Sequence, residues 1–116
     1  MSQSIYIIWN MQTEDEKFQL ALADDLAKNF ALDTSGADLA VENFFQELQA
    51  RLSQQIFDLI QNDYNRLLAI LYRIDVDEKT VSECLGGVDI FSAADNLARA
   101  VIERMIKKVR YRMGNY

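Results

Sequence analysis

The chain has 116 residues, of which 50% are hydrophobic and 26% charged, and it contains no proline and no histidine. Average usage would give about six prolines in this length, so the chain has few enforced breaks and long helices are favoured. The absence of histidine excludes a His general base, a Ser-His or Cys-His nucleophile pair, and every metal ligand set that contains His. We therefore predict a single helical domain over residues 1–116, acidic and soluble, with one hydrophobic core and no cofactor.

Cysteine content and apolar stretches bear on the compartment. The single Cys84 has no intrachain disulfide partner, which suits a reducing compartment. The apolar run at residues 5–9 is too short for a signal peptide and no Lys or Arg precedes it. No apolar stretch reaches the roughly 18 residues that span a bilayer, so we predict a cytoplasmic protein without a membrane partner.

A first helix is predicted over about residues 14–31. Thr13 and Glu16 have the spacing of a capping box, in which each side chain bonds the backbone amide of the other residue. The apolar positions that follow step at helical spacing: Phe18, Leu22, Leu26 and Phe30. The sequence at 33–36, Asp-Thr-Ser-Gly, then ends the pattern.

A second, longer helix is predicted over about residues 37–73. Its apolar line is Val41, Phe45, Leu48, Leu52, Ile56, Ile60, Tyr64, Leu67, Leu71 and Ile74. The mean step in this line is 3.67 residues, which favours a nearly straight packing seam over a left-handed coiled coil.

The length of this second helix conflicts with the size of a compact domain. Thirty-seven residues of helix would measure roughly 55 Å, whereas a compact domain of this length is only about 35 Å across. Either the helix kinks near the polar sequence at 61–63, or it protrudes and a second copy of the chain covers it. Apolar residues outside the main line, among them Phe57, Leu68 and Tyr72, favour burial on several sides.

Two further helices complete the predicted all-α bundle. Asp75 followed by Glu78 is typical of a capped start, and we expect a short helix over about 76–84 that Gly86 and Gly87 end. Asp89 or Ser92 then opens a last helix over about 90–112. The apolar stripe of this helix is Ile90, Ala94, Leu97, Val101, Met105 and Val109, with Ala98, Ile102 and Ile106 beside it.

The N-terminal residues 5–9 are β-branched or aromatic and favour an extended segment. A lone strand has no pairing partner in an otherwise helical chain. We expect it either to dock along the bundle or to pair with its own copy across a dimer axis.

The surplus of apolar residues in the second half of the long helix leads us to predict a homodimer. The residues expected at the dimer interface are Phe57, Ile60, Tyr64, Leu68 and Leu71. Phe44, Phe45, Tyr64 and Tyr72 could line a ligand pocket between helices. Aromatic residues at helical spacing are more often core, and we interpret these residues as core.

Carboxylates are the main remaining candidates for metal binding or acid–base chemistry. A Mg²⁺-dependent hydrolase resembling the all-α nucleoside triphosphate pyrophosphohydrolases would place acidic residues at i, i+3 or i+4 on facing helices. Asp24 and Asp25 are adjacent, and Glu42 and Glu47 are five apart, so no such set stands out. We interpret Asp75, Asp77 and Glu78 as helix-start residues and predict no metal site and no catalytic residue.

The net charge of −6 is distributed unevenly. Residues 1–103 have a net charge of −11, whereas residues 104–116 have a net charge of +5. The basic residues of this tail, a candidate patch for an anionic partner, are Arg104, Lys107, Lys108, Arg110 and Arg112. Cations with interleaved tyrosines can bind the phosphate backbone of a nucleic acid or stack on its bases. The acidic body would repel nucleic acid, so nucleic-acid binding is the less favoured interpretation.

The leading functional prediction is a non-catalytic protein-interaction or regulatory protein that acts as a homodimer and contacts another protein. The alternatives are the Mg²⁺-dependent hydrolase and a weak nucleic-acid binder that uses the basic tail. The absence of histidine and of recognisable catalytic patterns favours binding over catalysis. The sequence does not identify the partner.

Overall fold

The computed structural model describes the backbone of residues 16–36 and 41–114, and the side chains of 17–36 and 43–114. It confirms an all-α fold with five helices in this part of the chain: α2 (Glu16–Phe30), α3 (Val41–Asn62), α4 (Tyr64–Arg73), α5 (Glu78–Leu85) and α6 (Ile90–Arg112). The predicted capping box at 13–16 and the extended segment at 5–9 lie outside the described residues.

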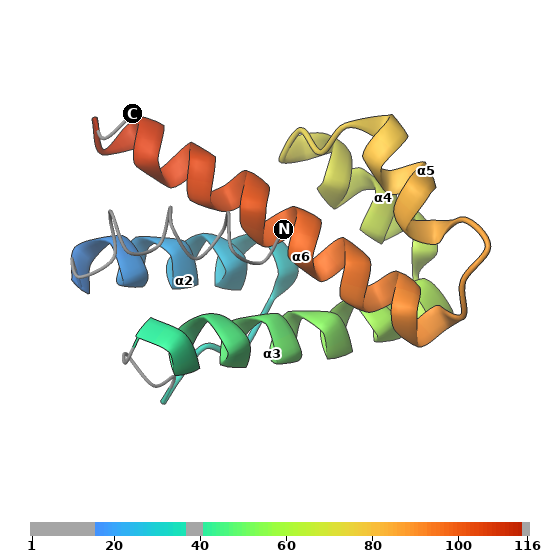
Figure 1. Ribbon diagram of the computed structural model, residues 1–116, viewed down its shortest axis with the longest axis horizontal. Helices are drawn as coiled ribbons and strands as arrows, with labels where there is room; N and C mark the ends of the chain where they lie inside the picture. The colour runs from blue at the N-terminus through green and yellow to red at the C-terminus, as the bar shows by residue number, and fades with distance from the viewer. Residues whose placement is uncertain (1–15, 37–40, 115–116) are drawn as a thin grey trace.

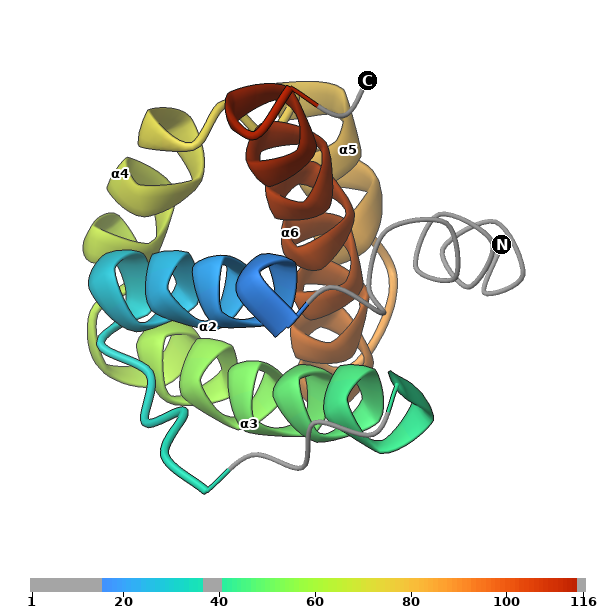
Figure 2. The ribbon, with the colours of Figure 1, turned by 90° about the vertical axis from the view of Figure 1, so that its left-hand side faces the viewer.

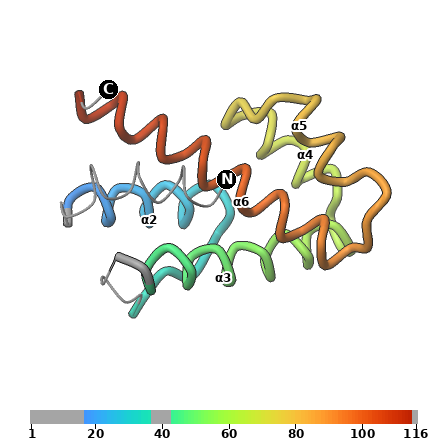
Figure 3. The backbone as a smooth tube through the Cα atoms, in the orientation of Figure 1, coloured from blue at the N-terminus to red at the C-terminus, as the bar shows by residue number. Residues whose placement is uncertain are grey.

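The helices form a compact bundle in which α6 is central. Helices α2 and α3 run in the same direction, and α6 crosses them diagonally in the opposite direction (Figures 1 and 2). Helix α6 packs against α3, α2 and α5, whereas α4 packs against the end of α3. The backbone trace in Figure 3 shows α4 and α5 stacked beside the first half of α6, at the end of the molecule away from the start of α2.

Helix α2 buries the stripe that its sequence predicts. Phe18, Leu22, Leu26 and Phe30 are all fully buried, because positions three or four residues apart lie on the same face of a helix. After the helix ends, the Nε2 of Gln55 donates to the Phe30 carbonyl at 2.9 Å. A carbonyl that would lack a partner in the last helical turn is thereby satisfied by a side chain of α3.

The predicted helix over 37–73 consists of two helices, α3 and α4, because the helical conformation is interrupted at Asp63. The Asp63 carboxylate accepts from the amide of Arg66 at 3.2 Å and caps the start of α4. The break shortens the molecule to 36 × 28 × 24 Å with a radius of gyration of 13.5 Å. The kinked alternative is therefore the correct one, and the length of the helix no longer argues for a second copy.

The apolar line of α3 differs from the prediction by one residue near its start and again at its end, where Leu59 is buried and the predicted Ile60 is half-buried. Phe44 is fully buried, whereas Phe45, which the 3.67-residue step selects, is half-buried. Further along α3 the predicted Leu48, Leu52 and Ile56 are fully buried. Adjacent apolar residues satisfy the spacing almost equally well, so periodicity alone does not choose between them.

The connection from α4 to α5 uses its aspartates differently from the prediction. Asp75 adopts a left-handed φ of +67°, and its carboxylate pairs with the guanidinium of Arg104 at 3.1 Å. It does not cap α5, whose N-cap is Asp77 without a side-chain cap bond. Beyond α5, Gly87 has a φ of +70°, a conformation that glycine adopts without the strain imposed by a Cβ.

Helix α6 supplies the largest share of the core. Its buried residues are Ala93, Ala94, Leu97, Ala98, Val101, Ile102, Met105, Ile106 and Val109. The predicted stripe is thus confirmed except at its first position, Ile90, which is half-buried. Asp89 caps the helix by accepting from the Ser92 amide at 2.9 Å, and this bond lowers the pKa of the Asp89 carboxyl.

Candidate interaction sites

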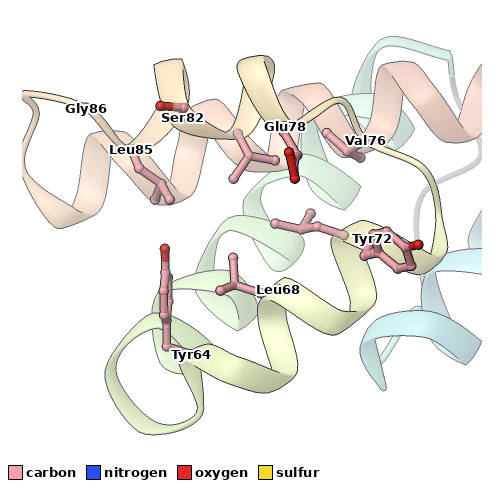
Figure 4. A pocket seen from close by; sticks show the side chains of 10 residues that line it. Tyr64, Leu68, Tyr72, Val76, Glu78, Ser82, Leu85 and Gly86 are labelled. Atoms are coloured by element: carbon pink, nitrogen blue, oxygen red, sulfur yellow. The ribbon is translucent and has the colours of Figure 1, made fainter.

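A groove between α4 and α5 is lined largely by apolar side chains (Figure 4). Its volume is about 630 Å³, within the range of roughly 300–1,000 Å³ found for ligand pockets. In Figure 4, Tyr64 and Leu68 point from α4 toward α5, and Leu85 points back toward them. We call this surface the α4–α5 groove; its lining residues are Tyr64, Leu68, Leu71, Tyr72, Val76, Glu78, Val81, Ser82, Leu85 and Gly86.

The packing of the two helices explains why the groove stays open. The chain reverses after α4, where the Val76 amide donates to the Leu71 carbonyl at 3.0 Å. Helix α5 then packs against α6, while α4 packs against α3. Each helix therefore buries one side on a different neighbour, and the apolar residues that face across the gap between α4 and α5 remain accessible.

The most exposed apolar residues of the groove form a stripe on α4. Tyr64, Leu68 and Tyr72 lie four residues apart and retain 40%, 38% and 85% of their accessible surface. Such spacing places all three on one face of a helix. Scattered exposed apolar residues are ordinary, but a contiguous exposed stripe beside a groove is typical of an interaction surface.

The five residues predicted for the dimer interface are not all in this groove. Tyr64 and Leu68 are there, and Leu71 forms its floor but is 2% exposed because it belongs to the core of its own chain. Phe57 and Ile60 lie on α3 and are half-buried. The ring of Phe57 stacks on that of Phe91, with centroids 4.6 Å apart.

The sequence carried a signal for the α5 side of the groove that the prediction did not use. Val81 and Leu85 are four residues apart on a short helix that has no fully buried residue. A helix that buries none of its apolar residues completely has a face available for contacts outside its own chain.

The basic residues of the tail fall into two groups. Four of the five predicted cations line one hollow of about 690 Å³ together with Tyr111: Arg104, Lys107, Lys108 and Arg112. Arg110 is not among the residues that line it. Arg104 pairs with Asp75, and Arg112 pairs with Asp25 of α2 at 3.0 Å.

The candidate carboxylates of the hydrolase interpretation are engaged with cations. Asp24 pairs with Lys28 at 2.9 Å, Asp25 with Arg112, and Glu47 with Arg51. The side chain of Glu42 lies outside the described residues. Within residues 17–36 and 43–114, no group of three potential metal ligands comes together.

Cys84 is half-buried on α5 and forms no disulfide. Burial raises the pKa of its thiol, and the neighbouring Glu83 carboxylate acts in the same direction because it disfavours a second negative charge. A raised pKa lowers the fraction of reactive thiolate at neutral pH.

We therefore expect Cys84 of the folded protein to react with iodoacetamide at pH 8 severalfold more slowly than free cysteine. Mass spectrometry of the alkylated protein against time measures the rate, and the urea-unfolded chain, which should react like free cysteine, is the control. A native rate equal to or above that of free cysteine would contradict this environment for the thiol.

Comparisons with protein-family models, curated proteins and solved structures find no match to this chain. None of the described helices is both long enough and apolar enough to cross a membrane.

Proposed function

We propose that the protein is a non-catalytic protein-interaction module that acts as a homodimer through the α4–α5 groove. The observation that carries the proposal is the exposed stripe of Tyr64, Leu68 and Tyr72 beside a groove lined by further apolar residues. Covering this stripe would remove apolar surface from water, which is the main driving force of most protein association.

The stripe favours a second copy of the chain as the occupant because it is symmetric about Leu68. A two-fold interface needs a surface that is complementary to itself. Tyr64 and Tyr72 lie four residues before and after Leu68. If two α4 helices pack antiparallel with Leu68 against the partner's Leu68, Tyr64 of each chain meets the partner's Tyr72.

The charges at the ends of α4 follow the same symmetry. Asp63 and Arg73 lie five residues before and after Leu68, and both are exposed. Neither forms an ion pair within the described part of its own chain; Asp63 accepts from the Arg66 amide, and the Nε of Arg73 donates to Asn29 at 3.3 Å. Residues five positions apart lie about 140° apart around a helix, so these two charges are not part of the stripe. Antiparallel packing nevertheless places each Asp63 at the same end of the helix pair as the partner's Arg73, and the attraction between these ends favours it over parallel packing.

The size of the contact sets the expected strength. Helix α4 has ten residues and is therefore about 15 Å long. Stable protein interfaces bury about 800 Å² on each partner, more than this short stripe and groove provide alone. We therefore expect a reversible dimer with a dissociation constant in the micromolar range, of the order of 1–100 μM.

Replacing Leu68 with glutamate is expected to abolish the dimer. Sedimentation equilibrium over a wide concentration range should give the wild type a mass that rises from 13.4 kDa toward twice that value, and the Leu68→Glu variant a mass of 13.4 kDa throughout. The reason is that each interface would have to bury two carboxylates at its centre without partners. Leu68 is already partly exposed, so the variant should keep its helical circular dichroism spectrum.

Leu20→Glu is the matched control, because Leu20 is an exposed leucine of α2 that does not line the groove. This variant should dimerise like the wild type. A wild type that stays at 13.4 kDa up to millimolar concentration, or equal dimerisation of Leu68→Glu, would overturn the proposal.

A further inference from the structure

A second surface, separate from the α4–α5 groove, lies on the C-terminal half of α6. Arg104, Lys107, Lys108, Tyr111 and Arg112 line one hollow and lie 0, 3, 4, 7 and 8 residues along the helix. This spacing puts them on one face, which we call the α6 basic face. The opposite face is fixed in the core, so the cations cannot turn away from solvent by rotation of the helix.

The two arginines at the ends of the basic face are held in place by neighbouring elements. The Nε of Arg104 donates to the Ile74 carbonyl at 3.3 Å, and its guanidinium also pairs with Asp75. Arg112 pairs with Asp25, whose side chain is largely buried. A guanidinium has five N–H donors, so each arginine keeps donors that these contacts do not use.

The two lysines in the middle have no such partners. Neither Lys107 nor Lys108 forms an ion pair or hydrogen bond within the described part of the chain, although the protein is acidic overall. Two uncompensated ammonium groups between two oriented guanidinium groups create a local positive potential.

The helix dipole accounts for only part of this arrangement. Cations near a helix C-terminus are favoured, but the effect is confined to about the last turn. The last turn of α6 contains Arg110 and Arg112, whereas Arg104, Lys107 and Lys108 lie further from the end. Their position on one face therefore needs another explanation.

We infer that the α6 basic face binds the phosphate groups of a small phosphorylated ligand. Guanidinium groups bind phosphate oxygens in a bidentate manner, and lysine ammonium groups are mobile point charges suited to the same oxygens. The hollow of about 690 Å³ is within the usual size range for small-ligand sites.

The charge distribution favours a small ligand over a long nucleic acid. The basic face spans eight residue steps, or about 12 Å of helix. Asp75 and Asp25 stand at its two ends, and residues 1–103 have a net charge of −11. A polyanion that extended beyond the face would meet repulsive surface, whereas a compact ligand would not.

The shared chemistry, a run of phosphates, could come from an inorganic polyphosphate or from a nucleotide. The exposed ring of Tyr111 lies on the same face and offers a surface on which a base could stack. Binding of inorganic triphosphate and of ADP, each followed by isothermal titration calorimetry at low salt, distinguishes the two sources. Tighter binding of ADP that Tyr111→Ala removes would assign the nucleotide.

The decisive variant is the double change Lys107→Gln with Lys108→Gln, because both residues are accessible and neither holds the fold together. We expect it to weaken triphosphate binding at least about tenfold. The matched control is Arg66→Gln with Lys79→Gln, which makes the same change in net charge at exposed positions of α4 and α5 outside the basic face. This control should bind like the wild type.

Each other outcome overturns the inference. Equal weakening in both double variants would mean that only net charge matters, and no heat from either ligand at millimolar concentration would mean that there is no site. If a single-stranded oligonucleotide bound more tightly than either small ligand, the ligand of the basic face would be a nucleic acid and the inference would be wrong. The mass of the Lys107→Gln, Lys108→Gln protein in sedimentation tests the homodimer separately, because neither lysine lines the α4–α5 groove.

Discussion

Phe30→Ala is expected to lower the free energy of unfolding by about 3–5 kcal/mol, the range found when a buried phenylalanine is truncated to alanine. Phe30 is fully buried at the end of α2 and belongs to the central core. The decrease has two parts: the favourable free energy of burying the ring, which is lost, and the cost of the cavity that remains where the ring was. Urea denaturation followed by circular dichroism, at a fixed protein concentration, measures the change.

Phe91→Ala is the control for this variant, because Phe91 is a phenylalanine that is 71% exposed. Its loss removes the stacking contact with Phe57, and the expected cost is at most about 1.5 kcal/mol. If the two variants lost the same stability, the assignment of Phe30 to the core would be wrong.

The buried faces of the long helices are the part of the fold that the sequence predicts best. In α2 and α6 the large apolar residues recur every three or four positions and most of the intervening residues are polar, with Leu20 and Phe91 as exposed exceptions, so the pattern selects one face of each helix for burial. In α3 the adjacent Phe44 and Phe45 fit the same pattern, and the choice between them depends on how α3 is rotated against its neighbours. Periodicity therefore fixes the face of a helix to within about one residue.

The sequence predicts the break between α3 and α4 only as one of two alternatives, the other being a continuous helix that a second copy of the chain covers. The apolar line runs through residue 63 without interruption, because Ile60, Tyr64 and Leu67 keep helical spacing. Asp63 is the N-cap of α4, and a capping aspartate in a continuous pattern looks like an ordinary solvent-facing residue. The size of a compact domain, rather than local propensity, pointed to the break.

The candidate sites required tertiary structure. The α4–α5 groove exists because α5 packs on α6 and leaves its apolar residues facing α4, and no spacing within one helix predicts that arrangement. For the basic tail, the sequence supplied the residues but not their pairing. Asp25 and Asp75 are far from residues 104–112 in the chain, yet they pair with the two end arginines, whereas Lys107 and Lys108 form no ion pair with any residue that the structure describes.

Leu97→Ala tests the buried face of α6, the helix that packs against α3, α2 and α5, and is expected to lower the free energy of unfolding by about 2–5 kcal/mol. Where the measured loss falls within this range depends on how far the neighbouring side chains and helices can move into the cavity. Ala94 and Ala98 lie beside Leu97 on the buried face, and helices that meet at small residues already lie close together. The backbones have little room to move further inward, so we expect a loss in the upper half of the range.

The same chemical change at an exposed position separates burial from helix propensity. Leu20 is 56% exposed on α2, and Leu20→Ala should change stability by no more than about 0.5 kcal/mol, because alanine is the better helix former and little packing is lost. Equal losses at positions 20 and 97 would contradict the central place of α6. A large loss at 97 alone would mean that the buried face of α6, the helix that packs against α2, α3 and α5, is part of the core on which the fold depends.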